Sequence, residues 1–162
     1  MPVNASNRMQ FLNSGQIDMI MATLGITPER QGQIAFSDAY VSAAGPSIMA
    51  RKSVKFDQWG QLKGQKVWGV QGSYFNKVVT QNYGLQLVNF AALPEAYRAL
   101  QDNRCVAMVF DDMSLQNKLK DAGWSDYKIA VKPYEFTPMA AGLRKGDDSF
   151  LAAVNQAIVK AE

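Results

Sequence analysis

The sequence of 162 residues contains no histidine and one cysteine, Cys105. Without histidine the chain lacks the commonest general base, the catalytic triads that depend on it and the usual zinc ligand. A single cysteine can form neither an intrachain disulfide nor a cysteine cluster. These absences exclude most metal and triad chemistry. Because Cys105 begins an apolar run, we interpret it as a small buried hydrophobic residue and not as a nucleophile.

Long apolar runs and dense basic runs are also missing. The longest uninterrupted apolar run covers only residues 105–110, whereas a membrane-spanning helix needs about 18 or more such residues. The net charge is only +3, and the 17 basic residues are scattered along the chain. The sequence therefore predicts neither a nucleic-acid-binding nor a membrane-binding patch. An apolar content of 48% is typical of a folded globular protein.

The hydrophobic pattern predicts alternating strands and helices. We expect strands at residues 17–22, 46–51, 67–70, 87–90, 105–110, 127–131 and 139–144. We expect helices after residue 6 or 7, over 74–83 and 94–100, after residue 111 or 112, and after residue 147 or 148. Segment 23–33 is expected to be irregular, because Gly25, Pro28 and Gly32 interrupt it. The alternation after residue 67 favours an α/β fold with a mainly parallel sheet.

Three places in the chain carry groups suited to a charged ligand. Ser73 and Tyr74 follow a predicted strand and open a predicted helix, so they either offer N–H donors to an anion or simply cap the helix. Asp111 follows another strand at its carboxyl end and either holds an ammonium group or caps the next helix. Arg30 lies in an irregular loop and either grips a carboxylate or forms a surface ion pair.

Eight segments in chain order form a set of known motifs. They are residues 13–20, 26–30, 34–40, 62–67, 70–73, 95–100, 106–111 and 142–147. The first resembles an L-x-S-G-x-x-D segment followed by a hydrophobic residue, the second a T-x-E-R signature, and the fourth an L-x-G-K-x-V entry into a second lobe. As a set they resemble the polar amino-acid-binding proteins of bacterial ABC importers, solute-binding protein family 3. The resemblance covers essentially the whole chain.

This resemblance implies a periplasmic-binding-protein-like (type II) fold, the two-lobe Venus flytrap of the α/β class. Lobe 1 would comprise residues 1–46 and 144–162, and lobe 2 residues 50–141, with hinge strands near 47–49 and 139–143. Family members carry an earlier strand, helix and strand, so we expect lobe 1 to be incomplete and both ends of the chain to be truncated. An incomplete lobe leaves strand edges and apolar faces open, which predicts a homo-oligomer.

The resemblance also implies how a ligand is held. Arg30 would grip the α-carboxylate of a free amino acid, helped by Thr23 and by Gly25, which can offer only backbone where the family often has Ser or Thr. Ser73 and Tyr74 would add N–H donors, and Asp111 would bind the α-ammonium. The expected partner is an ABC permease, the expected location is periplasmic or cell-surface, and no metal, cofactor or catalytic residue is implied.

Two other functions stay open at this point. The chain could be a truncated variant that no longer binds a ligand and acts as a self-associating interaction module. It could also be an enzyme resembling the cyclohexadienyl or arogenate dehydratases of the same fold, in which case Glu29 or Asp112 would have to be the general acid. Which amino acid would be bound is not indicated, because the aromatic residues after the strands are too generic to decide it.

Overall fold

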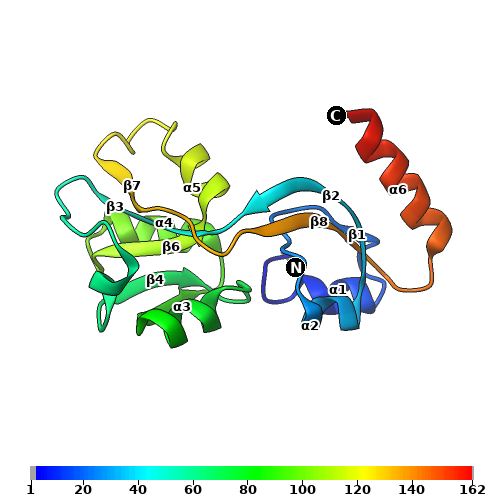
Figure 1. The fold of residues 1–162 in the computed structure, drawn as a ribbon, viewed down its shortest axis with the longest axis horizontal. Coiled ribbons are helices and arrows are strands. Elements are labelled where there is room, and N and C mark those ends of the chain that lie inside the picture. Colours follow the sequence, from blue (N-terminus) through cyan, green and yellow to red (C-terminus); the bar gives the residue numbers. More distant parts are fainter. Residues whose placement is uncertain (1–2, 162) are drawn as a thin grey trace. The chain divides into compact units, whose positions relative to one another are not determined.

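The computed structural model describes residues 3–161 and divides the chain into two compact units of an α/β fold (Figure 1). Unit 1 contains residues 3, 7–44 and 137–161, and unit 2 contains residues 4–6 and 45–136. The chain therefore passes between the units at residues 3–4, 6–7, 44–45 and 136–137. Among the helices of the described residues, none is both long enough and apolar enough to cross a membrane.

Unit 1 is built on a three-stranded antiparallel sheet in the order β1-β8-β2. The strands are β1 (Met19–Ile20), β2 (Ala35–Ala44) and β8 (Thr137–Leu143). The helices are α1 (Arg8–Asn13), α2 (Pro28–Gln33) and α6 (Asp148–Ala161). The side chain of Asn155 accepts a hydrogen bond from the backbone N–H of Asp38 at 2.9 Å, which ties α6 to β2.

Two sequence expectations for unit 1 are wrong, and one strand was missed. The buried strand expected over residues 17–22 shrinks to β1, and Met21 beyond it is 62% exposed. The irregular segment contains α2, because Pro28 stands at the first helical turn, where its missing N–H costs nothing, and Thr27 caps that turn. The ten-residue strand β2 was not anticipated.

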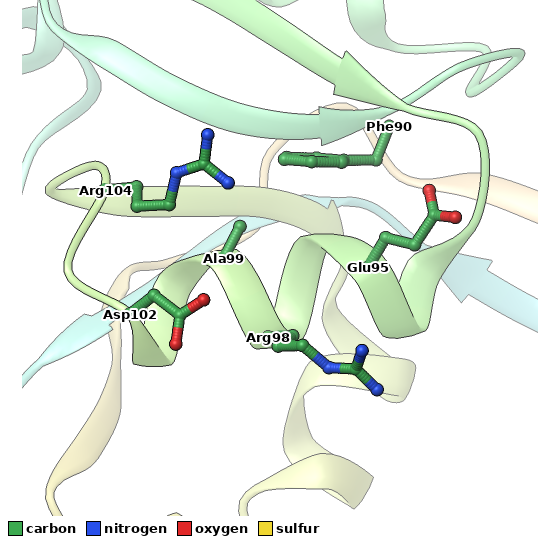
Figure 2. A pocket seen from close by; sticks show the side chains of 6 residues that line it. All are labelled: Phe90, Glu95, Arg98, Ala99, Asp102 and Arg104. Carbon is green, nitrogen blue, oxygen red and sulfur yellow. The ribbon is translucent and has the colours of Figure 1, made fainter.

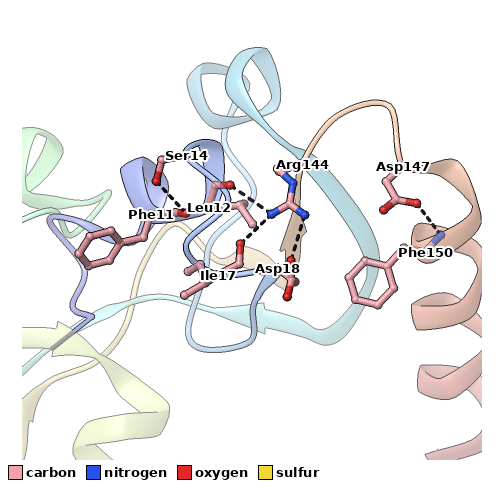
Figure 3. Close-up of polar contacts among 8 residues, drawn as sticks. All are labelled: Phe11, Leu12, Ser14, Ile17, Asp18, Arg144, Asp147 and Phe150. Atoms are coloured by element: carbon pink, nitrogen blue, oxygen red, sulfur yellow. Dashed lines mark hydrogen bonds and ion pairs between the residues drawn. The ribbon is translucent and has the colours of Figure 1, made fainter. Parts of the chain in front are cut away.

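Arg144, which directly follows β8, joins the two halves of the unit 1 sequence (Figure 3). Its guanidinium donates to the carbonyl oxygens of Leu12 and Ile17, at 3.4 and 2.8 Å, and forms an ion pair with Asp18 at 3.0 Å. Asp147 accepts from the backbone N–H of Phe150 at 3.1 Å. This bond confirms the expectation that an aspartate at 147 or 148 caps the last helix.

The core of unit 1 is small, so each of its side chains matters. Leu12 is fully buried against Ile20, Leu24 and Ile34. We expect Leu12→Ala to lower the unfolding free energy of unit 1 by about 2–5 kcal/mol, because it leaves a cavity in a packed cluster. Chemical denaturation followed by circular dichroism measures the change, and the exposed neighbour Gln10→Ala is the control. Equal midpoints for the two variants would contradict this packing.

Unit 2 is a five-stranded mixed sheet in the order β5-β4-β6-β3-β7. Its strands are β3 (Pro46–Arg51), β4 (Lys66–Val70), β5 (Gln86–Phe90), β6 (Ala107–Asp111) and β7 (Tyr127–Val131). Its helices are the 3₁₀ turn η1 (Trp59–Leu62), α3 (Asn76–Tyr83), α4 (Leu93–Gln101) and α5 (Asp112–Lys118). Strand β4 pairs in parallel with β5 and β6, but β3 runs antiparallel to both β6 and β7. The mainly parallel sheet is thus corrected to a mixed one.

Buried side chains pack in two clusters within unit 2. One cluster joins β3 and β6 to α3 and η1 through residues such as Ile48, Val79 and Val109. The other joins β4 and β6 to α4 and α5 through residues such as Trp68 and Leu115. The strand residues alternate between the two clusters, as the two-residue period of a sheet buried on both faces requires. This packing holds the carboxyl ends of β4 and β6 in place.

Candidate ligand-binding site

Arg30 is positioned by the loop that precedes it in unit 1. The backbone N–H of Arg30 donates to the hydroxyl of Thr27 at 3.3 Å, which closes the first turn of α2. The guanidinium Nη1 of Arg30 donates to the carbonyl oxygen of Gly25 at 3.0 Å. Gly25 is buried and forms a β-bridge with Met139 of β8. The structure therefore brings Arg30 and Gly25 together and fixes the orientation of the guanidinium.

Thr23 belongs to the same loop, which is anchored to β8. The N–H of Ala140 donates to the carbonyl of Leu24 at 3.3 Å, and the N–H of Ile26 donates to the carbonyl of Pro138 at 3.0 Å. These hydrogen bonds hold residues 23–26, which we call the ledge, against the sheet and beside Arg30. This ledge is a short connection with defined hydrogen bonds, which suits a ligand-contacting backbone.

Ser73 and Tyr74 lie in a turn between β4 and α3, and not in the helix itself. The helix begins at Asn76, with Phe75 as a cap residue whose side chain makes no cap bond, so the expected helix start at residue 74 is wrong. Gly72 has φ of +81°, and the N–H of Ser73 donates to the carbonyl of Val70 at 3.2 Å. These bonds form a turn that delays the helix by two residues.

The turn changes which donor Ser73 can offer. Its backbone N–H is already engaged by the Val70 carbonyl, so the sequence expectation of an N–H donor to a ligand from Ser73 itself is not supported. Its hydroxyl Oγ is buried and makes no hydrogen bond within the described residues. A buried polar atom in that state is destabilising by about 1–3 kcal/mol until a partner satisfies it. The hydroxyl is therefore the group with which Ser73 can meet a ligand oxygen.

Asp111 ends β6 and caps α5. Its Oδ1 accepts from the N–H of Ser114 at 2.8 Å, and the residue is only 1% exposed. The capping role that the sequence offered as an alternative is thus confirmed. Burial, and then the negative charge of Asp111, raise the pKa of the nearby Tyr97 phenol. Because Asp111 itself is buried, its carboxylate lies in a low-dielectric setting, where a cation is attracted more strongly than in water.

The parallel pairing of β4 with β6 brings the Ser73–Tyr74 turn and Asp111 to one edge of the unit 2 sheet. Val67 pairs with Ala107 and Trp68 with Met108, so both strands end at the same carboxyl edge. The rings of Phe75 and Phe110 meet edge to face, with centroids 6.1 Å apart. Ligands of open α/β sheets bind at such an edge.

Asp112, the neighbour of Asp111 that the sequence offered as a possible general acid, has a structural role that the sequence did not indicate. Asp112 Oδ1 accepts from the N–H of Gly45 at 3.1 Å, and the N–H of Asp112 donates to the Gly45 carbonyl at 3.0 Å. This pair fixes the first residue of unit 2 after the crossing at 44–45. Glu29, the other candidate acid, is exposed on α2. Among the described residues, no group of three His, Cys, Asp or Glu side chains could hold a metal ion.

Cys105 is half-buried, and its Sγ donates to the carbonyl of Ala107 at 2.8 Å. Burial raises the pKa of this thiol from 9.0 to about 12. Because the thiolate is the reactive form, we expect iodoacetamide at pH 8 to alkylate the folded protein at least about 100-fold more slowly than the protein unfolded in guanidinium. The folded-state rate should rise as the pH approaches 12. Equal rates in both states would contradict this environment.

One pocket lies apart from these residues, along helix α4 of unit 2. Its volume is about 200 Å³, and it is lined by Phe90, Glu95, Arg98, Ala99, Asp102 and Arg104. Figure 2 shows the Phe90 ring above α4, with Arg104 on one side and Glu95 on the other. None of the candidate ligand-binding residues lines it. Arg104 therefore supplies an exposed arginine for control variants.

Comparison with known proteins decides the family. A family model for bacterial extracellular solute-binding proteins, family 3, matches residues 1–162. The chain belongs to this family. The protein is 29% identical over 160 residues to the ABC transporter glutamine-binding protein GlnH of Bacillus subtilis, covering 98% of this chain and 58% of that protein. It is 30% identical over 156 residues to the lysine/arginine/ornithine-binding periplasmic protein of Escherichia coli, covering 91% of this chain and 60% of that one.

Solved structures agree with this family assignment. The arginine-bound form of truncated ArgBP from T. maritima superposes with a TM-score of 0.90 and 25% identity, over 100% of this chain and 76% of that chain. The cysteine-binding protein from Campylobacter jejuni gives a TM-score of 0.89 and 27% identity, over 98% of this chain and 63% of that chain. The fold is thus that of the two-lobe type II periplasmic binding proteins, of which this chain covers a part.

This chain matches only part of the length of each relative. It spans about 60% of the length of the curated relatives described above. The family and the relatives named above are solute-binding proteins and not enzymes. They therefore give no support to the alternative that this chain is a dehydratase. According to their names, the Bacillus subtilis relative binds glutamine and the Escherichia coli relative binds lysine, arginine and ornithine.

Proposed function

We propose that this protein binds a free α-amino acid by its carboxylate and its ammonium group, as the solute-binding component of ABC-type import, without catalysis. The observation that supports the proposal is a pair of oppositely charged groups, one in each unit. Unit 1 holds an arginine oriented by a backbone carbonyl, and unit 2 holds a buried carboxylate at the carboxyl edge of its sheet. A cationic fork and one carboxylate match the two ends of a zwitterion.

Each candidate residue has a defined part in this proposal. Arg30 binds the α-carboxylate with two parallel N–H donors, and Thr23 and Gly25 contribute from the adjoining ledge. Ser73 donates its hydroxyl to a carboxylate oxygen, which would satisfy a buried atom that has no partner within the described residues. Tyr74 contributes its backbone N–H to the carboxylate, and Asp111 accepts from the α-ammonium.

The transport setting belongs to the proposal as well. We place lobe 1 at residues 1–46 and 144–162, lobe 2 at residues 50–141, and hinge strands near 47–49 and 139–143. The partner is the permease of an ABC importer, and the location is periplasmic or cell-surface. The family is one of extracellular solute-binding proteins, and the Escherichia coli relative is named as a periplasmic protein, which supports this setting.

A panel of the twenty common amino acids, titrated calorimetrically into the protein, tests the proposal. We expect a saturable heat, with one ligand per chain, for at least one amino acid or a small group of similar ones. Circular dichroism should confirm before each titration that the protein is folded. The absence of heat then reflects the binding site and not an unfolded chain. No saturable heat from any of the twenty would contradict the proposed function.

A second candidate is an interaction module that self-associates through unit 1. It is favoured by exposed apolar side chains there, Met21 at 62% and Val159 at 68%, and by the two-residue strand β1 at the edge of the sheet. Such edges and side chains can pair with a second copy. Light scattering at micromolar concentration that finds a dimer, together with a silent amino-acid panel, would favour this candidate. A monomer would refute it.

A further inference from the structure

We propose that Asn76 is a positioning residue, whose side-chain amide holds the turn of residues 71–75 in the shape that presents the Ser73 hydroxyl to the ligand carboxylate. This inference rests on the proposed function, because it assigns a role at the same site. Asn76 was not singled out by its sequence, since a polar residue at the first turn of a helix is common.

Asn76 spans the turn with three hydrogen bonds. Its amide Nδ2 donates to the carbonyl of Val70 at 2.8 Å and to Oδ1 of Asn89 at 3.3 Å, and its backbone N–H donates to the carbonyl of Ser73 at 3.3 Å. The Val70 carbonyl therefore accepts from both the Ser73 N–H and the Asn76 amide. The last residue of β4, the turn and the first residue of α3 are joined at one oxygen atom.

A neighbouring strand supports the Asn76 amide. Asn89 lies on β5, and its Oδ1 would come within 2.4 Å of a Cβ added at Gly69 on β4. Gly69 is thus required inside a strand because the Asn89 side chain lies directly against its backbone. The N–H of Gln71 also donates to the carbonyl of Phe90 at 2.8 Å, so β5 supports both ends of the connection.

The other side of the turn is equally constrained. Gly72 has φ of +81°, and a Cβ there would lie 2.5 Å from the carbonyl oxygen of Ala5. The turn is therefore enclosed between residue 5 and the Asn76–Asn89 pair. Binding groups held by fixed neighbours lose less freedom when a ligand arrives, which is the physical basis of a positioning role.

The decisive variant is Asn76→Asp, which keeps the shape but removes both amide donors. It also places a carboxylate oxygen against the Val70 carbonyl, so the turn should loosen. Asn82→Asp is the matched control, because it makes the same charge change at an exposed position of the same helix. Asn89→Asp keeps the Oδ1 acceptor and should behave like the wild type.

The first measurement is amide hydrogen exchange of the free protein. We expect peptides covering residues 71–75 to exchange at least about 10-fold faster in Asn76→Asp than in Asn82→Asp, with little change in α4. Unchanged exchange in this turn would overturn the inference, whether or not the protein binds an amino acid. If Asn76→Asp does not fold, Asn76→Ala gives the same comparison.

The second measurement compares the affinities for a bound amino acid and for its α-carboxamide, in which an amide replaces the α-carboxylate. A turn that positions the carboxylate contact should lower the affinity of Asn76→Asp for the acid by about 10-fold and leave the affinity for the amide within about 2-fold. Equal losses for both ligands would mean a merely structural role and overturn the inference. A wild-type protein that binds no amino acid would refute the proposed function and, with it, this ligand role, while the exchange result would still report on the turn.

Discussion

Replacing Arg30 by alanine is expected to weaken amino-acid binding by at least about 100-fold. Two charge-assisted hydrogen bonds to a carboxylate contribute on the order of 3 kcal/mol together, and every 1.4 kcal/mol is a factor of ten in affinity. Arg30 is oriented by the Gly25 carbonyl and is half-buried, so little ordering is needed when the ligand arrives. Isothermal titration with the amino acid identified by the panel measures the loss.

Two further variants make the Arg30 result specific. Arg30→Lys keeps the charge but loses the planar fork, so we expect an intermediate loss of about 10-fold. Arg104→Ala removes an exposed arginine beside the α4 pocket and should leave the affinity within about 2-fold, which controls for net charge. An Arg30→Ala variant that binds as tightly as Arg104→Ala would contradict the carboxylate role.

Replacing Asp111 by asparagine is expected to remove most of the binding while preserving the fold. The change removes the negative charge that attracts an ammonium, for an expected loss of about 100-fold. Asparagine still presents an oxygen to the N–H of Ser114, and it caps helices about as well as aspartate. We therefore expect the thermal midpoint to move by no more than about 3 °C. Titration calorimetry and thermal denaturation together test both parts.

The neighbouring aspartate provides the matched control for this charge. Asp112→Asn keeps an oxygen for the N–H of Gly45 and makes the same charge change one residue away. It should bind the amino acid within about 3-fold of the wild type, because Asp112 is assigned a structural part. Asp111→Ala should lose both binding and about 0.5–2 kcal/mol of stability, since the cap is lost as well. Equal effects of Asp111→Asn and Asp112→Asn on affinity would refute the ammonium role.

The strands of unit 2 could be predicted from sequence because each is a short apolar run between turn residues. Residues 46–51 and 127–131 were predicted with the observed bounds, and 67–70 and 87–90 to within one residue. Strand direction was not predictable, because an apolar run buried on both faces reads the same in a parallel and an antiparallel pair. Only the pairing of β3 between β6 and β7 reveals that the sheet is mixed.

Strand β2 was missed because its pairing with β8 is irregular. The register shifts between Phe36 and Ala39 and at two later points, so the two-residue alternation that marks a strand is broken. At the first shift, the hydroxyl of Ser37 accepts from the N–H of Ala141 at 2.9 Å, in place of a backbone carbonyl. A side chain that completes the ladder in this way leaves no periodic signal in the sequence.

The candidate site was predictable in part. Asp111 was placed correctly at the end of a strand, because a carboxylate after an apolar run marks the carboxyl edge of a sheet. The loop around Arg30 was misread, since Pro28 was taken as a breaker although proline favours a first helical turn. The turn at Ser73 could not be predicted because its shape depends on Asn89 and Ala5, which are distant in sequence.

The most direct test of the account compares three ligands in one titration series. They are the amino acid that binds best, its carboxamide, and the α-hydroxy acid in which a hydroxyl replaces the ammonium. We expect each derivative to bind at least about 100-fold more weakly than the amino acid, because each lacks one of the two charged groups that face a protein group of opposite charge. Either derivative binding within about 3-fold of the amino acid would contradict recognition of the zwitterion by both ends.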